Sequence, residues 1–360
     1  MSEVDERRRI CSADTDTPLF SVVVIGRNEG ARLAKCLESV ERVRDVAVKE
    51  IIYVDSASTD GSPELASRYG AVVALVCSER PTAALGRNIG WRRAETDFVL
   101  FLDGDTVLHE DFPLAAFYAM ASDSSIAAVW GHRREIHPEA SIFNRVLDLD
   151  WMYKPGFTEF CGGDVLIRRK ALTETGGYDE NLIAGEEPEL CRRIRGCGYK
   201  VLHIDHPMTG HDLQITRWSQ YWKRAMRAGH AYAEVSERYR KSDDPSWTSE
   251  RKGNLIRGSF WPISLLIAIL LSVRLGFLPF ALWVTMLLLA SVRSAWKARW
   301  KEINPWALLL FGIHSHIQHV PILVGQLQYE LDKRQGKAQK LIEYKERRVN
   351  RWSLRKIRTP

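Results

Sequence analysis

Two aspartates that flank one glycine, Asp103 and Asp105, come directly after the apolar run "FVLFL". Aspartate and glycine are common in turns, so a turn is the simplest interpretation of "LDGDT". Two carboxylates at this spacing can also share a divalent cation, because Mg²⁺ and Mn²⁺ prefer oxygen ligands and usually keep substrate phosphates in their shell. The pair alone does not decide between a turn and a metal–diphosphate site, so the neighbouring motifs matter.

Other polar residues also follow apolar runs. Asn28 and Glu29 come after "SVVVIGR", and Asp55 comes after "EIIYV". Asp55 offers an acceptor to a base or a ribose, and Arg87, in "GRNIG", offers a guanidinium to a base carbonyl or a phosphate. Arg87 could instead be an ordinary surface residue of a helix. The first strand lacks the glycine-rich dinucleotide fingerprint and the chain lacks a P-loop motif, which disfavours a dehydrogenase or a P-loop NTPase.

A second group of candidate residues lies downstream, in "GEEPEL" and "HDLQITRW". Glu186 and Glu187 precede a helical pattern, where the helix dipole alone favours acids. The functional interpretation is a general base that takes a proton from a hydroxyl nucleophile. His211 could complete a metal shell and Arg217 could face a diphosphate. Trp218 could stack on a sugar ring or belong to the core.

Alternating apolar and amphipathic segments must position these residues. Strands are predicted at residues 19–26, 50–58, 71–77, 97–103, 164–169 and 199–205, and helices at 30–43, 82–95, 186–198 and 215–241. Strands that alternate with helices indicate an α/β fold with a mainly parallel sheet flanked by helices. In such open sheets, ligands bind beyond the carboxyl ends of the strands, where the polar residues described above are found.

The character of the sequence changes after a polar linker at residues 242–254. Residues 259–273 and 276–292 are apolar runs, each somewhat shorter than the roughly 20 residues that span a bilayer. They fit two tight membrane spans, a re-entrant hairpin, or a buried helical hairpin of a soluble domain. The flanks, 251–257 and 293–301, are both basic, which predicts that both ends lie on the cytoplasmic side.

A third apolar run, residues 305–329, carries His314, His316 and His319 near its centre. Polar groups at the middle of a membrane are costly. We therefore expect this segment to lie in the membrane interface or to pack on the preceding hairpin.

The composition is that of a folded protein, with 360 residues, 45% hydrophobic and 27% charged. The net charge of +6 is concentrated at the C-terminal end, where residues 328–360 hold eleven Lys/Arg and four acids, a balance of +7. Such a tail fits an anionic membrane surface or nucleic acid. Nucleic-acid binding would leave the acids at the strand ends without a role, so anionic lipids are the expected partner. The six scattered cysteines and the polar N-terminus, with no secretion signal, indicate reduced thiols in the cytosol.

Five motifs in order make the chain resemble family 2 glycosyltransferases over about residues 20–205. They are "VVVIGRNEG", "IIYVDSASTDGS", "GRNIGWRRAETDFVLFLDGDT", "CGGDVLIRRKALTETGGYDE" and "EEPELCRRIRGCGYKV". The resemblance implies the GT-A fold, a nucleotide-diphospho-sugar donor, a divalent metal (Mn²⁺ or Mg²⁺) and inversion at the anomeric carbon.

The resemblance also implies roles for individual residues. Asp55 would contact the nucleotide base in a pocket with Asn28, Glu29 and Arg87; Asp103 would touch the ribose or the metal, and Asp105 would ligate the metal. His211 remains a further candidate ligand on the chemistry of its imidazole. Glu187 stands at the family's base position, but a glutamate replaces the usual aspartate, so either Glu186 or Glu187 could be the base. Arg217 joins the catalytic group, and Gly163, Asp164 and Trp218 are assigned to the acceptor.

"QITRW", residues 214–218, also fits the Q-x-x-R-W pattern of processive polysaccharide synthases. The expected protein has an N-terminal tail (1–18), a catalytic domain (19–241), a linker (242–254), a membrane hairpin with an interfacial helix (255–329) and a basic cytoplasmic tail (330–360). We expect a membrane-associated transferase, with its catalytic domain in the cytoplasm and a lipid-linked or growing glycan acceptor. The alternatives are a processive synthase and a non-catalytic membrane scaffold.

Overall fold

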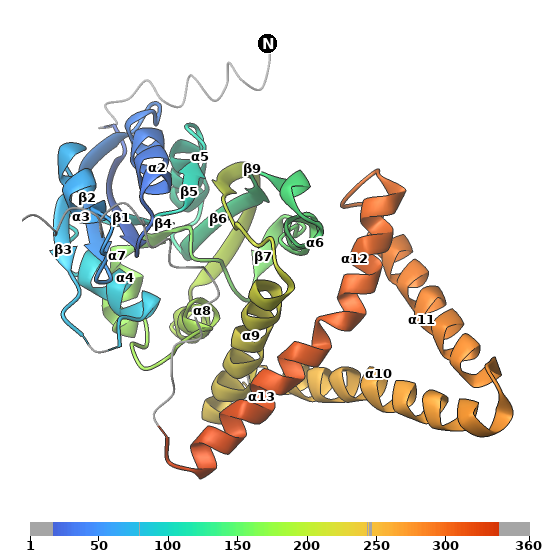
Figure 1. The fold of residues 1–360 in the computed structure, drawn as a ribbon. Coiled ribbons are helices and arrows are strands. Elements are labelled where there is room, and N and C mark those ends of the chain that lie inside the picture. Colours follow the sequence, from blue (N-terminus) through green and yellow to red (C-terminus); the bar gives the residue numbers. More distant parts are fainter. Residues whose placement is uncertain (1–16, 79, 243, 245–246, 338–360) are drawn as a thin grey trace, which may run out of the picture.

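The computed structural model describes residues 17–337, except 79, 243, 245 and 246 (Figure 1). Most of the predicted N-terminal tail lies outside the described residues. The same is true of the basic tail from residue 338 onward.

One nine-stranded sheet forms the centre of the part of the chain that precedes α9, Trp218–Tyr239 (Figure 1). Eight strands follow the order β3-β2-β1-β4-β8-β6-β9-β5, and β7 also pairs with β9. The bounds are β1 Leu19–Gly26, β2 Ala47–Asp55, β3 Val72–Leu75, β4 Phe98–Asp103, β5 Thr106–Leu108, β6 Ile126–Glu135, β7 Gly156–Thr158, β8 Val165–Arg168 and β9 Lys200–His211. The α/β class is therefore confirmed.

The first four strands are parallel, as the alternating pattern predicts. The rest of the sheet is mixed, because β8 runs antiparallel to both β4 and β6, whereas β6 and β9 are parallel. β5 and β7 then pair antiparallel with β9. In the parallel half, Ile25 is paired with Asp103 and Gly26 with Asp55, so the carboxyl ends of β1, β2 and β4 meet at one edge.

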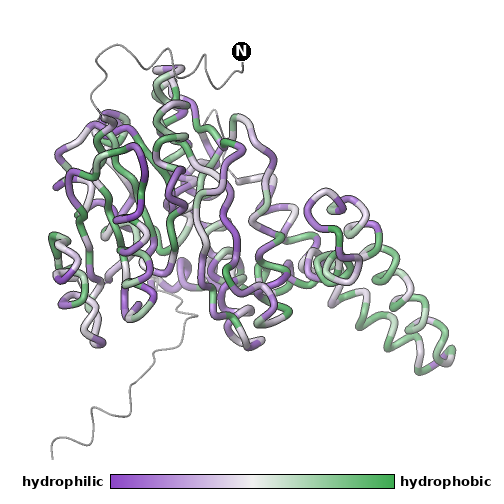
Figure 2. The backbone as a smooth tube through the Cα atoms, turned by 90° about the horizontal axis from the view of Figure 1, so that it is seen from above, coloured by the Kyte–Doolittle hydropathy of each residue, from purple (hydrophilic) through white to green (hydrophobic). Residues whose placement is uncertain are grey.

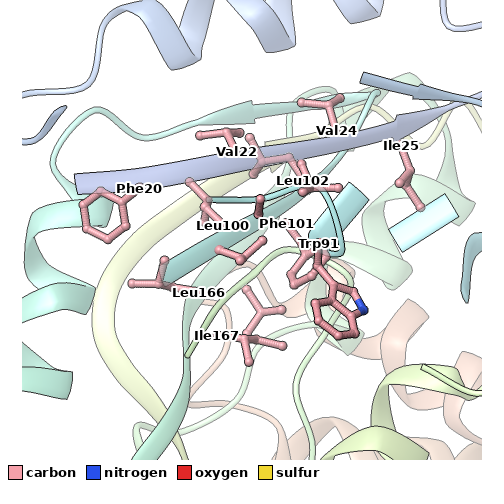
Figure 3. Close-up of a cluster of buried hydrophobic side chains, with 14 of the residues drawn as sticks. Phe20, Val22, Val24, Ile25, Trp91, Leu100, Phe101, Leu102, Leu166 and Ile167 are labelled. Atoms are coloured by element: carbon pink, nitrogen blue, oxygen red, sulfur yellow. The ribbon is translucent and has the colours of Figure 1, made fainter. Parts of the chain in front are cut away.

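Helices cover both faces of the sheet. Side chains alternate across a strand, so Phe20 and Val23 of β1 point to opposite faces. Phe20 contacts Phe117 of α5, whereas Val23 lies against Gly90 of α4. Figure 3 shows the resulting core, in which apolar side chains of β1, β4 and β8 meet Trp91 at the end of α4. The helices of this part are α2 Ala31–Glu41, α3 Ser62–Arg68, α4 Ala83–Trp91, α5 Phe112–Ser122, the 3₁₀ turn Pro138–Ala140, α6 Ile142–Asp150, α7 Arg169–Thr175 and α8 Glu186–Gly196.

The C-terminal region is helical, with α9 Trp218–Tyr239, α10 Thr248–Leu275, α11 Leu278–Lys297, α12 Pro305–Ile317 and α13 His319–Arg334. α10 begins inside the predicted linker, where Arg251 forms ion pairs with Glu237 and Glu330. Three segments, α10, α11 and α12 with α13, are long and apolar enough to cross a membrane. α10 and α11 project away from the sheet and are mostly hydrophobic (Figures 1 and 2). Their exposed apolar side chains are consistent with membrane association.

The third apolar segment packs on the rest of the protein. α13 lies along α9 and α10, and α12 contacts α11 and α6 (Figure 1). His314 hydrogen-bonds the Tyr221 hydroxyl of α9 at 2.8 Å, and His319 bonds Asn254 of α10 at 3.0 Å. The His316 Nε2 also hydrogen-bonds the Ser294 hydroxyl of α11 at 3.2 Å. All three central histidines therefore have protein partners, which removes much of the cost of placing them in an apolar segment.

Glycines allow α13 to lie directly against α9. A Cβ atom at Gly325 would overlap the Met226 carbonyl oxygen, and one at Gly229 would overlap that of Ile322. We expect Gly325→Ala to lower the free energy of unfolding by about 1–3 kcal/mol, the usual cost of overpacking. Thermal unfolding in detergent measures the effect. Gly253→Ala is the control, because a Cβ at Gly253 of α10 meets open space. Equal shifts in both variants would contradict this account.

Candidate active site

The loops after β1 and β2 hold each other in place. Asn28 has a left-handed backbone (φ 57°), and its Oδ1 accepts the Thr59 N–H at 2.7 Å. Asp55 accepts the Tyr53 hydroxyl at 3.0 Å and the Ser58 N–H at 2.7 Å, and it is only 1% exposed. Asp55 thus lies at the predicted sheet edge, with its carboxylate directed into this loop network. Its proposed contact with a nucleotide base stays a prediction.

The loop from β4 to β5 carries Asp103 and Asp105, and the buried carboxylate of Asp164 holds it in place. Asp164 accepts the Asp103 N–H at 2.9 Å and the Thr209 hydroxyl at 2.8 Å. Burial and the neighbouring Asp103 raise the pKa of Asp164. Asp164 is fully buried, so the geometry supports a role in positioning this loop rather than in touching an acceptor.

Asp103, Asp105 and His211 form a group that could hold a metal ion. One ligand atom from each lies within 4.8 Å of the others, and the His211 Nε2 is 3.5 Å from an Asp105 carboxylate oxygen. Register explains the meeting, because Thr106 of β5 pairs with His211 at the end of β9. Burial, with Arg133 nearby, lowers the pKa of His211 to about 3. The imidazole is therefore neutral at pH 7, as a metal ligand must be.

Arg87 joins the metal-site loop, the β4–β5 loop that carries Asp103 and Asp105, to the two glutamates. It is 2% exposed on α4, so it is not a surface residue. Its guanidinium forms ion pairs with Asp103 at 2.9 Å, Glu186 at 3.0 Å and Glu187 at 3.2 Å. These contacts place both glutamates, at the first turn of α8, beside the strand-end acids.

The two glutamates differ in environment. The Glu186 side chain is 5% exposed and that of Glu187 is 19% exposed, so Glu187 has more access to a ligand. Burial and the neighbouring Glu186 raise the pKa of Glu187 to about 7, against the pull of Arg87. A carboxylate whose pKa lies near neutral pH is suited to general-base chemistry.

Most of these residues line one cleft of about 540 Å³. Nine predicted site residues contribute to it: Asn28, Glu29, Arg87, Asp103, Asp105, Gly163, Glu186, Glu187 and His211. Asp55, Asp164, Arg217 and Trp218 are not among its lining residues. Residues that were not predicted to belong to the site also line it, among them Arg133, Arg224, Arg227, Tyr232 and Trp247.

The Q-x-x-R-W motif leads into α9, with Arg217 at the N-cap and Trp218 as the first helical residue. The Gln220 Oε1 accepts the backbone N–H groups of Thr216 and Arg217, both at 3.0 Å. Trp218 stacks on Tyr221, with ring centroids 5.2 Å apart, and is 49% exposed. The described contacts therefore give this motif a local role at the helix N-terminus. The diphosphate and sugar contacts assigned to Arg217 and Trp218 stay predictions.

Comparison with known proteins agrees with this geometry. Residues 21–174 match the family described as Glycosyl transferase family 2. The chain carries a family 2 glycosyltransferase domain. A solved structure of the mannosyltransferase PcManGT from Pyrobaculum calidifontis, in complex with GDP-Man and Mn²⁺, has the same fold, with a TM-score of 0.62 at 18% identity. The alignment covers 90% of this chain and 93% of that one.

Curated relatives of the glycosyltransferase domain are distant. This chain is 23% identical over 205 residues to glycosyltransferase AglE of Haloferax volcanii. It is 24% identical over 214 residues to O-antigen chain rhamnosyltransferase WbaN of Salmonella anatum. These matches cover 54% and 55% of this chain, and 66% and 68% of the relatives. The poly-beta-1,6-N-acetyl-D-glucosamine synthase of Staphylococcus aureus is 23% identical over 195 residues, covering 48% of this chain and 47% of the synthase. The chain thus spans about two thirds of the first two and about half of the third.

The position of Arg87 in the glycosyltransferase domain leads to a prediction about stability. Arg87→Met leaves Asp103, Glu186 and Glu187 close together without their shared cation, and breaking a buried ion pair costs about 3–5 kcal/mol. In the wild type Arg87 opposes the rise in the pKa of Glu187 that burial and Glu186 cause, so loss of the cation raises this pKa further above its unfolded value. The variant is therefore most stable at low pH and loses stability as the pH rises. Thermal unfolding at pH 6 and pH 8 tests this.

Arg92→Met is the matched control for this measurement. Arg92 follows α4 and pairs with Glu180 at 3.0 Å, but both side chains are largely exposed. A pair of this kind contributes about 1 kcal/mol at most. If Arg87→Met were no less stable than Arg92→Met at pH 8, the buried ion pairs of Arg87 would not stabilise the folded protein.

Proposed function

We propose that this chain is an inverting, metal-dependent glycosyltransferase. It transfers a sugar from a nucleotide-diphospho-sugar to a hydroxyl of a lipid-linked or growing glycan acceptor at the cytoplasmic face of a membrane. One observation carries the proposal: the Asp103–Asp105–His211 group and the Glu186–Glu187 pair line the same cleft, joined by Arg87. Such a cleft can hold a donor between a metal and a base.

Asp105, Asp103 and His211 would hold the metal. Two carboxylates and a neutral imidazole suit Mn²⁺ better than Mg²⁺, because imidazole is a poorer ligand for the harder ion. When bound, the metal neutralises charge that develops on the departing nucleoside diphosphate. Asp164 fixes the metal-site loop through the Asp103 backbone N–H. Asn28 and Glu29 line the cleft beside this loop, in position to contact the nucleotide.

Glu187 would act as the general base. It takes the proton of the acceptor hydroxyl while that oxygen attacks the anomeric carbon on the face opposite the leaving diphosphate. Arg87 holds the Glu187 carboxylate in position and balances part of its charge. Gly163 lines the same cleft and leaves room there, because a Cβ atom would meet the Asp103 carboxylate at 3.0 Å.

The apolar helices support a membrane-bound acceptor. α9 contributes residues to the cleft and also packs against α10 and α13 (Figure 1). An acceptor held in the bilayer could therefore reach the cleft from the apolar helices. The basic residues at both ends of the hairpin support a cytoplasmic orientation and contact with anionic lipids.

A donor panel tests the proposal. Full-length protein in detergent is incubated with UDP-, GDP- and dTDP-sugars and a membrane lipid extract, with Mn²⁺, with Mg²⁺ or with a chelator. We expect release of nucleoside diphosphate from one donor, only with a divalent ion, and inversion at the anomeric carbon of the product by NMR. The enzymatic proposal fails if no donor is consumed with either metal. Protein that stays soluble at high salt without detergent would contradict the membrane part.

The same assay separates the alternatives. A processive synthase would yield long products at low conversion, and a non-catalytic scaffold would consume no donor. The relative named as a polysaccharide synthase and residues 214–218 are the grounds for processivity. Because Arg217 and Trp218 are not among the residues lining the cleft, we propose a single transfer.

A further inference from the structure

Three arginines line the cleft beyond the acidic group. Arg133 comes from β6, and Arg224 and Arg227 come from α9. All three are half-buried, and none of their guanidinium groups forms a hydrogen bond or an ion pair with another residue in the part of the chain that the structure describes. Arginine is mostly exposed in folded proteins and is almost never fully buried unless its charge is paired. Three half-buried arginines without such a pair in a single cleft indicate a site for an anion.

Two of these arginines converge on one aromatic ring. The guanidinium carbon of Arg133 lies 4.8 Å from the centroid of the Trp151 ring, and that of Arg224 lies 5.9 Å from it. Two like charges that share one indole repel each other, and the cost rises as water is excluded. A bound anion would remove this cost, and two planar guanidinium groups are suited to bidentate contact with phosphate oxygens.

The arginine pair lies between the metal-binding group and the apolar helices. The Trp151 ring centroid is 5.0 Å from that of His211. On the other side, Trp151 directly follows α6, which packs against α12. The Lys301 ammonium group, between α11 and α12, donates to the Leu149 carbonyl of α6 at 2.7 Å. A molecule that enters from the apolar helices would meet Arg133 and Arg224 before it meets the metal site.

We propose that Arg133 and Arg224 bind a phosphate group carried by the acceptor. The inference rests on the proposed function and names the chemistry of its acceptor. The donor diphosphate would bind at the metal held by Asp103, Asp105 and His211, and this metal would balance its charge. The arginine pair supplies separate positive charge on the side that faces the apolar helices. A phosphate held there would anchor the acceptor while its hydroxyl extends toward Glu187.

A binding experiment without any donor tests the proposal. Full-length protein in detergent is titrated with farnesyl phosphate, with farnesol and with inorganic phosphate. Wild type is expected to bind farnesyl phosphate at least tenfold more tightly than farnesol. Arg133→Gln and Arg224→Gln should each weaken farnesyl phosphate binding about tenfold and leave farnesol binding unchanged, whereas Arg224→Lys should retain part of the affinity. Lys223→Gln is the control, because it removes one charge from an exposed neighbour on the same helix.

The arms of the experiment also identify the source of the phosphate. Tighter binding of farnesyl phosphate than of inorganic phosphate supports a lipid-borne phosphate, and equal binding supports a phosphate on a soluble acceptor. The proposal is overturned if Arg133→Gln and Arg224→Gln bind farnesyl phosphate like Lys223→Gln, at unchanged thermal stability. It is also overturned if these variants weaken binding of GDP or UDP with Mn²⁺ instead. No transfer reaction is needed, so a failed donor panel would leave this result interpretable.

Discussion

Asp105→Asn is expected to lower kcat/KM by more than about a hundredfold. Asparagine keeps the size of the side chain but removes the charge that a divalent ion needs. A bound metal contributes several kcal/mol to charge stabilisation, and each 1.4 kcal/mol corresponds to about a tenfold change in rate. Asp105 is 3% exposed and lies in the 4.8 Å group with Asp103 and His211, so no solvent ligand easily replaces its carboxylate. Activity against Mn²⁺ concentration measures the effect.

A binding readout separates metal loss from misfolding. Mn²⁺ with a nucleoside diphosphate should raise the thermal unfolding midpoint of the wild type, because ligands that bind only the folded state stabilise it. Asp105→Asn should lose this rise while keeping the midpoint of the ligand-free protein. Asp123→Asn is the control, since Asp123 pairs with Lys200 away from the cleft. An unchanged response of Asp105→Asn to Mn²⁺ would contradict the assignment of the metal site.

The meeting of the strand-end acids could be predicted from the sequence. Continuous apolar runs fix β1 and β4 as buried parallel strands, and parallel strands end at one edge. Glu29, Asp103 and Asp105 lie in one cleft for this reason. Asp55 lies at the same edge, but its carboxylate points toward Tyr53 and Ser58, from which it accepts hydrogen bonds. A side-chain direction of this kind depends on the fold of a few loop residues, which strand patterns do not specify.

The basic side of the cleft could not be predicted from the sequence. Arg133 lies on β6, whose partner β9 is about 75 residues away in the chain, and the local pattern of "IAAVWGHRRE" carries no sign of that pairing. Arg224 lies on a helix that the sequence does predict. The side of α9 that faces the cleft is nevertheless set by α13, which packs on it through Gly229 and Gly325. Long-range packing, rather than local periodicity, places these arginines.

The Arg87 network also depended on tertiary contacts. Sequence reasoning offered Arg87 to a nucleotide, and the structure places its guanidinium among three carboxylates. The ambiguity between Glu186 and Glu187 has a physical origin, because consecutive residues in the first turn of a helix point in different directions. Their different exposure, 5% and 19%, depends on how the first turn of α8 is placed beside Arg87 and the cleft, and not on the glutamates themselves.

Glu187→Gln should remove most of the transfer activity. Loss of a positioned general base costs about 10²–10⁴-fold in rate, and glutamine keeps the shape and the contact with Arg87 while it cannot accept the proton. Burial and the neighbouring Glu186 raise the pKa of Glu187 to about 7. Because the base acts when it is deprotonated, the wild-type kcat/KM should rise with pH and level off above this value. This rise should be absent from the residual activity of Glu187→Gln. Initial rates between pH 5.5 and 9 measure both effects.

Glu186→Gln is the matched comparison, one residue away on the same helix turn. Glu186 is the more buried of the two and contacts Arg87 at 3.0 Å, so its loss should lower kcat far less and leave the pH dependence in place. Glu187→Asp retains the carboxylate but withdraws it by one methylene, and it should recover part of the rate. Donor hydrolysis and nucleotide binding should be similar in both glutamine variants, because neither residue belongs to the metal-binding group. If Glu186→Gln loses the activity and the pH dependence while Glu187→Gln keeps them, Glu186 is the base.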